Sequence, residues 1–105
     1  MIGVFCFVLD VTEQRLHELE IQRMAYEDVL TRVHNRRYIE LAFEECLTRK
    51  EEQITVIISD LDKFKEANDT FGHATGDKIL IEFGDILTKI MPESAVIARL
   101  GGDEF

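Results

Sequence analysis

Acidic side chains stand at the ends of two apolar segments of this chain. Asp60 and Asp62 follow the apolar run of residues 54–58, while Asp103 and Glu104 follow a second apolar segment and two glycines. The Gly-Gly pair suits a tight hairpin turn, because glycine readily adopts positive φ angles. If the two segments are neighbouring antiparallel strands, the carboxylates converge on one sheet edge and repel each other unless a cation is bound. Oxygen ligands favour Mg²⁺ or Mn²⁺ over zinc, although two unrelated, solvated acidic turns are an open alternative.

The segment after Asp62, "KFKEANDTFGHATGD", carries groups that suit a nucleotide. A short helix over residues 63–69 would begin at the cation edge and direct its free backbone N–H groups at phosphates. Asn68 offers a donor and an acceptor, and Asp77 accepts two N–H bonds, as guanine N1 and N2 require. Turn and helix-cap chemistry explains Asn68 and Asp77 equally well.

Residue spacing excludes several familiar sites. An EF-hand loop beginning at Asp60 would need glycine and glutamate where the chain has Lys65 and Phe71. No Walker A sequence is present. Cys6 and Cys46 lie forty residues apart with no CxxC motif, which disfavours zinc and is typical of buried thiols in a reducing compartment.

The elements that must position these residues form an α/β pattern. Residues 54–58 are continuously apolar, as in a strand covered on both faces, and residues 94–100 form a second predicted strand. Asn35 caps one predicted helix, and Pro92 follows another. Two apolar stripes with helical spacing are predicted to lie in the core: Tyr38, Ile39, Ala42, Phe43, Cys46 and Leu47 in the first helix, and Ile79, Leu80, Phe83, Ile86, Leu87 and Ile90 in the second.

The N-terminal segment follows a different pattern. Residues 4–9, "VFCFVL", are predicted to form a buried strand and are too few to span a bilayer. Asp10 and Glu13 suit a capping box that begins a helix extending to about Asp28. The helix carries two apolar i,i+3 pairs, which favour packing along a partner helix in an imperfect coiled coil: Leu16 with Leu19, and Ile21 with Met24.

Composition limits the partners of the protein. The chain has 105 residues, 46% of them hydrophobic and 31% charged, which is typical of one modest globular domain. Its formal net charge of −9 argues against broad binding to nucleic acid or to anionic membranes. No membrane segment is predicted, and we expect a cytoplasmic location, with membrane anchoring elsewhere in a parent protein left open.

Three motifs in this order resemble the first half of a GGDEF domain, the diguanylate cyclase family: "AYEDVLTRVHNRR", "DLDKFKEANDTFGHATGD" and "RLGGDEF". The resemblance implies an α/β (α+β) fold, a nucleotidyl-cyclase-like palm with an antiparallel sheet and flanking helices, incomplete in this chain. It implies that two GTP molecules condense into cyclic di-GMP and two pyrophosphates, with Mg²⁺ or Mn²⁺ as cofactor. It also implies a homodimer formed through the N-terminal helix.

The same resemblance implies roles for the acidic residues. Asp60, the backbone carbonyl of Leu61 and Asp103 would bind the metal ion. Glu104 would act with Asp103 in catalysis, by supporting the metal or the 3′-hydroxyl that loses its proton. Asp62 matches the motif without an assigned ligand role.

Nucleotide contacts follow from the resemblance in the same way. The backbone around Lys63 and Phe64 would cradle the phosphates, and Asn68 with Asp77 would hold guanine. Many members carry an Arg-x-x-Asp inhibitory product site where this chain reads "PESA" over residues 92–95, so no such site is expected.

The resemblance divides the chain into three parts. Residues 1–12 resemble the end of a PAS sensor domain with its last strand and "DVTE" exit motif, residues 13–28 a signalling helix, and residues 29–105 the first half of the GGDEF domain. Arg32 and Val33 replace the usual Gly-Leu of the family. Because the second half is missing, we expect this chain to be a truncated piece that is inactive alone. The alternative function is a non-catalytic module that binds GTP or relays a signal by dimerising.

Overall fold

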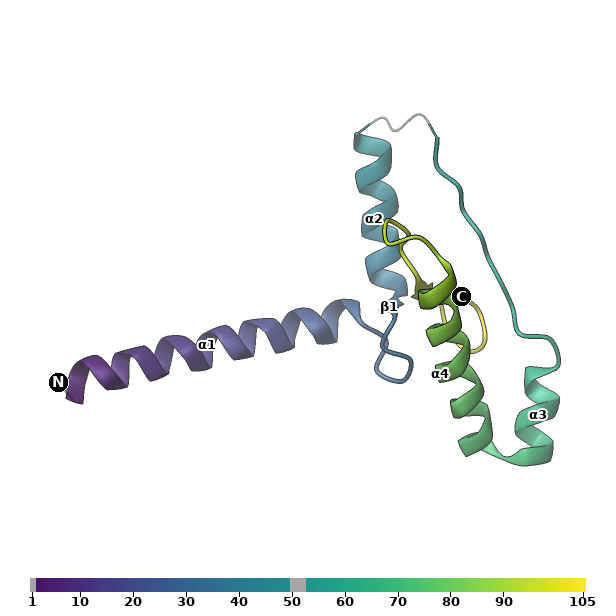
Figure 1. Ribbon diagram of the computed structural model, residues 1–105, viewed down its shortest axis with the longest axis horizontal. Coiled ribbons are helices and arrows are strands. Elements are labelled where there is room, and N and C mark those ends of the chain that lie inside the picture. The colour runs from purple at the N-terminus through teal and green to yellow at the C-terminus, as the bar shows by residue number, and fades with distance from the viewer. Residues whose placement is uncertain (1, 50–52) are drawn as a thin grey trace.

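A long helix projects from an α/β body (Figure 1). The computed structural model describes the backbone of residues 2–49 and 53–105, and side chains from residue 13 onward within those ranges. The elements in chain order are α1 (Ile2–Tyr26), β1 (His34–Asn35), α2 (Arg36–Thr48), α3 (Phe64–Phe71), α4 (His73–Ile90) and β2 (Ala98–Arg99). The predicted mixed α/β class is confirmed, although the sheet is small.

Helix α1 includes the segment that was predicted to be a strand. The strand over residues 4–9 is wrong, because the helix already begins at Ile2 and Asp10 lies within it instead of capping it. A strand needs a neighbour for its N–H and C=O groups, whereas a helix satisfies them within its own segment. The predicted side-chain environment of Cys6 lies outside the described residues. None of the helices in the described ranges is long and apolar enough to cross a membrane.

Helix α2 begins where the sequence predicts. The side chain of Asn35 accepts a hydrogen bond from the Tyr38 N–H at 3.1 Å, as expected of an N-cap. Its amide group also donates to the carbonyl of Ala25 at 2.9 Å, which fastens the start of α2 to the end of α1. The predicted core stripe of α2 is wrong in part, because Phe43 and Leu47 are exposed and no residue of α2 is buried.

Helices α3 and α4 form a hairpin around Gly72 and lie side by side (Figure 1). The core lies along α4 and is formed by Val33, Leu80 and Phe105. Phe105 and Phe83 meet edge to face, with their ring centroids 4.9 Å apart. Helix α4 ends just before Pro92, as predicted.

Strand pairing differs from the prediction. β1 and β2 pair in parallel, with His34 opposite Ala98 and Asn35 opposite Arg99. Residues 59–61 pair antiparallel with residues 103–105, so the residues that follow the first predicted strand pair with the return of the hairpin and not with residues 94–100.

The first predicted strand is also not covered on both faces. Residues 53–58 have no strand partner among the described residues, and Ile58 is 71% exposed. An apolar run predicts burial only when other segments lie against it, and no described segment does so here.

Candidate functional site

A glycine turn carries the acidic motif. Gly101 and Gly102 have φ angles of +149° and +54°, which L side chains rarely adopt. A Cβ atom at either glycine would meet nothing within 4 Å, so the backbone conformation alone requires glycine. The hairpin closes with hydrogen bonds from Leu100 N–H to the Glu104 carbonyl, 2.8 Å, and from Glu104 N–H to the Gly101 carbonyl, 3.0 Å. The predicted tight hairpin is therefore confirmed.

The return of this hairpin brings two of the predicted metal ligands together. Ser59 and Phe105 exchange backbone hydrogen bonds of 2.8 and 2.9 Å, and Leu61 N–H donates to the Asp103 carbonyl at 3.4 Å. This register pairs Asp60 with Glu104, and the neighbouring Asp103 raises the pKa of the Asp60 carboxyl group more than any other residue does.

The pKa of Asp60 is raised above its ordinary value by these surroundings. The largest cause is the hydrogen bond with Asp103, and the remaining causes include the negative charges of Asp103, Glu104 and Asp62. Glu104 and Asp62 are thus close enough to act on Asp60 electrostatically. The site is an exposed edge with excess negative charge, which a cation would relieve.

The donor set fits a hard divalent cation. Mg²⁺ commonly binds through one or two carboxylates and completes its shell with water and substrate phosphates. Asp60 and Asp103 supply two such groups, and the carbonyl of Leu61 lies next in the chain. Among the side chains that the structure describes, in residues 13–49 and 53–105, no cluster of three or more His, Cys, Asp or Glu residues has metal-binding geometry. The two carboxylates would therefore form only part of the shell of such a cation.

Lys63 and Phe64 lie at the start of α3, close in sequence to Asp60. The helix runs from Phe64 to Phe71, so the short helix predicted over residues 63–69 is present with slightly shifted ends. Lys63 has a left-handed backbone with φ of +57°, and no side chain caps the helix. Backbone N–H groups in the first turn of α3 are therefore available to an anion.

Asn68 and Asp77 lie on the two arms of the α3–α4 hairpin. A Cβ atom at Gly76 would overlap Oδ1 of Asn68 and lie 2.8 Å from its Cγ, so Asn68 packs against the helical turn that contains Asp77. Oδ1 of Asn68 is buried without a hydrogen-bond partner in the described structure, while Asp77 is exposed. A buried amide oxygen without a partner is costly, which makes this position a candidate for ligand contact.

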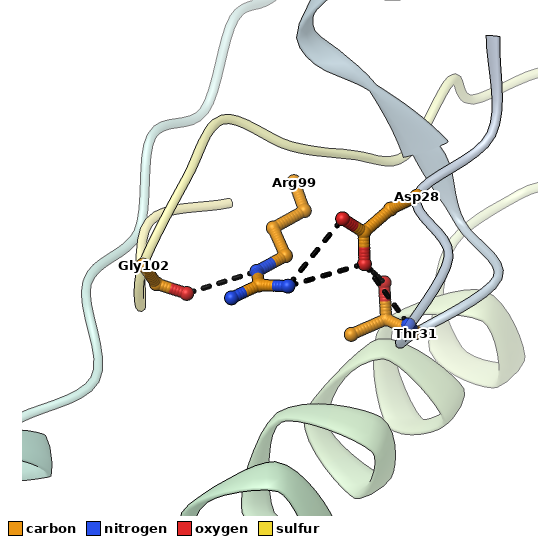
Figure 2. Close-up of polar contacts among 4 residues, drawn as sticks. All are labelled: Asp28, Thr31, Arg99 and Gly102. Atoms are coloured by element: carbon orange, nitrogen blue, oxygen red, sulfur yellow. Dashed lines mark hydrogen bonds and ion pairs between the residues drawn. The ribbon is translucent and has the colours of Figure 1, made fainter. Parts of the chain in front are cut away.

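A second polar cluster, which the sequence reasoning missed, lies beside the hairpin (Figure 2). Arg99 donates through Nε to the Gly102 carbonyl at 2.9 Å and through Nη1 to Oδ1 and Oδ2 of Asp28 at 3.4 and 3.3 Å. Thr31 donates to Asp28 Oδ2 from its backbone N–H, 2.9 Å, and from its hydroxyl, 2.7 Å. The motifs "AYEDVLT" and "RLGGDEF" contain these residues, but their spacing gives no sign of contact.

Asp28 is ionised more readily than an ordinary aspartate. Burial is the largest single influence and by itself raises the pKa of Asp28. The hydrogen bonds from Thr31 and the charge and hydrogen bond of Arg99 together outweigh it, so the pKa is lowered. Asp28 is therefore a carboxylate at neutral pH.

Comparison with known proteins gives consistent similarities. The family model described as "Diguanylate cyclase, GGDEF domain" matches residues 25–105. The diguanylate cyclase DgcS of Shewanella oneidensis is 38% identical over 96 residues, which cover 86% of this chain and 32% of that protein.

Solved structures agree with this match. The coiled coil and GGDEF domain of DgcB from Caulobacter crescentus, in complex with c-di-GMP, superposes with a TM-score of 0.82 and 29% identity over 96% of this chain and 55% of that chain. A sensory box/GGDEF family protein from Caulobacter crescentus has a TM-score of 0.66 and 39% identity, over 76% of this chain and 53% of that one. The chain thus spans about a third of DgcS and about half of each solved chain.

Proposed function

Since the chain belongs to the GGDEF domain family of diguanylate cyclases, we propose that it supplies the metal and nucleotide contacts of an enzyme that condenses two GTP into cyclic di-GMP and two pyrophosphates. The observation that carries this proposal is the antiparallel pairing of residues 59–61 with residues 103–105. This pairing sets Asp60 opposite Glu104 and Leu61 opposite Asp103, close in sequence to the start of α3, which supports a shared site.

Asp60, the Leu61 carbonyl and Asp103 would hold Mg²⁺ or Mn²⁺. When bound there, the cation would lower the pKa of the attacking 3′-hydroxyl and offset the charge that develops on the α-phosphate. Glu104 lies on the same hairpin and acts on Asp60 electrostatically, which supports a role beside the metal or the 3′-hydroxyl.

GTP would lie between the start of α3 and the α3–α4 hairpin. The first turn of α3, at Lys63 and Phe64, has no side-chain cap and would donate backbone N–H groups to the phosphates. Asn68 and Asp77 would hydrogen-bond the guanine edge, a role supported by the unsatisfied Oδ1 of Asn68. A base contact at Asn68 would satisfy that buried oxygen.

The enzyme would act as a dimer that meets through α1. A cyclic product with two identical halves is naturally assembled between two identical subunits, each of which presents one GTP. Four large apolar residues of α1 are between 53% and 74% exposed and would form the contact: Leu16, Leu19, Ile21 and Met24. The similarity over 96% of this chain to a structure described as a coiled coil and GGDEF domain supports this arrangement.

A sensor upstream of α1 would regulate that dimer. We propose that residues 13–28 are a signalling helix that follows a PAS domain, as the resemblance implies; the end of that domain, predicted at residues 1–12, would then be helical from Ile2 onward instead of a last strand. The similar solved structure described as a sensory box/GGDEF family protein supports the presence of a sensor in the same protein. The free thiol of Cys46 and the acidic composition agree with a cytoplasmic reaction.

The direct test is product formation from GTP and Mg²⁺, followed by chromatography, in a full-length GGDEF protein that carries these residues. Asp60→Ala and Asp103→Ala are expected to lower turnover at least about a hundredfold, because each removes a metal ligand. Asp85→Ala removes an exposed aspartate of α4 outside the site and should leave turnover unchanged. Full turnover in both site variants would refute the assignment, and GTP binding without turnover in the unmodified protein would favour the relay module.

A further inference from the structure

The pair formed by Arg99 and Asp28 joins the end of α1 to the hairpin that carries Asp103 (Figure 2). We propose that Arg99 is a positioning residue for the cation site, and that it makes the orientation of Asp103 depend on the turn that follows α1. The inference rests on the proposed function, in which Asp103 is a metal ligand. Asp28 lies 71 residues before Arg99, so the contact links two distant parts of the chain.

The carbonyl of Gly102 belongs to the peptide unit that precedes Asp103. Gly102 has a left-handed backbone and no side chain, so nothing within the residue itself holds that peptide plane. The Nε of Arg99 donates to this carbonyl at 2.9 Å. The hydrogen bond from Leu61 N–H to the Asp103 carbonyl is longer, 3.4 Å, and holds the residue less firmly. The hydrogen bond from Arg99 is therefore the shorter of these two restraints on the backbone at Asp103.

The guanidinium of Arg99 also pairs with Asp28. Nη1 of Arg99 contacts both carboxylate oxygens of Asp28, and the two side chains are only 16% and 20% exposed. Partial shielding from water strengthens a charge-assisted pair relative to the exposed pairs of this chain. The lowered pKa of Asp28 keeps the carboxylate charged at neutral pH.

Asp28 lies close to the end of α1. Asp28 is two residues beyond Tyr26, the last residue of the helix, and the Glu27 N–H still donates to the Arg23 carbonyl at 2.9 Å. Thr31 is 3% exposed and fixes Asp28 with two hydrogen bonds. A displacement of the last turn of α1 relative to the body therefore moves Asp28, and through Arg99 it acts on the Gly102 carbonyl.

Arginine is the residue type that this role needs. Its planar guanidinium reaches the Gly102 carbonyl with one nitrogen and Asp28 with another, whereas lysine has a single nitrogen at its end. Arg99→Lys thus keeps the charge and removes the simultaneous contact. Asp28→Asn keeps an oxygen that accepts from Thr31 and removes the charge that pairs with Arg99.

The test is the Mg²⁺ dependence of cyclic di-GMP formation at saturating GTP, in a full-length GGDEF protein that carries these residues. Arg99→Lys and Asp28→Asn are each expected to raise the half-saturating Mg²⁺ concentration about tenfold, the usual effect of losing a group that orients a ligand. The KM for GTP at saturating Mg²⁺ should change less than twofold. The half-saturating Mg²⁺ concentration of the double variant should be no higher than that of the more strongly affected single variant, because both substitutions break the same connection.

Arg49→Lys is the matched control, because Arg49 makes an exposed ion pair of 3.7 Å with Glu45 on α2. It should leave the Mg²⁺ dependence unchanged. A lowered urea midpoint with an unchanged Mg²⁺ dependence in Arg99→Lys and Asp28→Asn would show a purely structural pair and overturn the inference. If one variant does not fold, the other decides the question. Full turnover in Asp103→Ala would instead refute the proposed function, so the two failures are distinguishable.

Discussion

Asp28 and Asp60 have carboxyl pKa values that are shifted in opposite directions. For Asp28 the pKa is lowered, so its ionised form stabilises the folded state above its ordinary pKa of about 4, and this stability is lost as the pH falls through the lowered value. For Asp60 the pKa is raised, chiefly by the hydrogen bond with Asp103. The stability contributed by its protonated form is present below pH about 4 and is lost as the pH rises through the raised value.

This difference predicts how the effects of two substitutions on the melting temperature depend on pH. Asp60→Asn should raise the melting temperature at pH 7 without Mg²⁺, because it removes charge repulsion, and should have little effect at pH 3. Asp28→Asn should lower the melting temperature at pH 7, with a smaller effect at pH 3. Thermal unfolding followed by circular dichroism at both pH values measures this. If Asp60→Asn lowers the melting temperature at pH 7, this result would contradict the charge repulsion inferred at Asp60.

Arg32 has a left-handed backbone, with a φ of +65°, although it is not a glycine. A left-handed conformation costs an L residue about 1–2 kcal/mol, while glycine adds a smaller cost through the entropy of the unfolded chain. Arg32→Gly should therefore increase the free energy of unfolding by about 0.5–1 kcal/mol, since its exposed ion pair with Glu27 contributes little. Arg32→Ala removes the same charge but keeps a Cβ atom, so it should give no such gain. Urea unfolding of both variants measures the difference, and equal stability of the two would refute the argument.

The packing of α3 against α4 predicts a specific role for Gly76. Alanine at this position would force the Asn68 carboxamide to turn away, because its Cβ would overlap Oδ1. If Asn68 contacts guanine, Gly76→Ala should raise the KM for GTP about tenfold, the equivalent of one hydrogen bond. Gly84→Ala is the matched control on the same helix, since its Cβ would lie at an ordinary 3.4 Å from Cγ1 of Val33. An unchanged KM in Gly76→Ala would remove Asn68 from the base site.

Helix α1 predicts the oligomeric state. Leu19 and Met24 are 53% and 74% exposed in the single chain, and glutamate at both positions would place charge between two paired helices. The double variant Leu19→Glu and Met24→Glu should be monomeric and should lose most cyclase activity in a full-length protein. Gln22→Glu adds a charge at another exposed position of α1 and serves as the control. Sedimentation of an unchanged dimer in the double variant would remove α1 from the mechanism.

Local sequence patterns predicted the elements better than their partners. Asn35 and Pro92 mark helix ends by local chemistry, and both predictions are confirmed. The strand over residues 4–9 was wrong because β-branched and aromatic residues favour a strand only when a neighbouring strand is present. The proximity of Asp60 to Asp103 and Glu104 was predicted from the ends of two apolar segments, although through a different pairing. The contact between Asp28 and Arg99 gave no sequence signal, because neither periodicity nor spacing encodes a pairing over 71 residues.

The whole molecule combines an organised hairpin with an apolar segment that has no partner. Phe105 is buried against Phe83 and fixes the return of the hairpin, so the backbone pairing of residues 59–61 with residues 103–105 forms within these 105 residues. Residues 53–58 expose a row of apolar side chains, and segments of this kind tend to pair with further β-structure. The chain spans 55% of the DgcB chain to which it is similar. We therefore expect the cation site to be only partly ordered in this chain alone and fully ordered in a complete domain.

The most direct test of the cation site proposed at Asp60 and Asp103 is the binding of Mn²⁺ to a complete GGDEF protein with these residues. This binding is followed by electron paramagnetic resonance in the presence of GTP. We expect one strongly held Mn²⁺ for each bound GTP, and a loss of affinity of about tenfold or more in both Asp60→Asn and Asp103→Asn. Asp85→Asn, outside the site, should bind as the unmodified protein does. Unchanged Mn²⁺ affinity in both Asp60→Asn and Asp103→Asn would contradict the claim that the hairpin return and the end of the first apolar segment form one cation site.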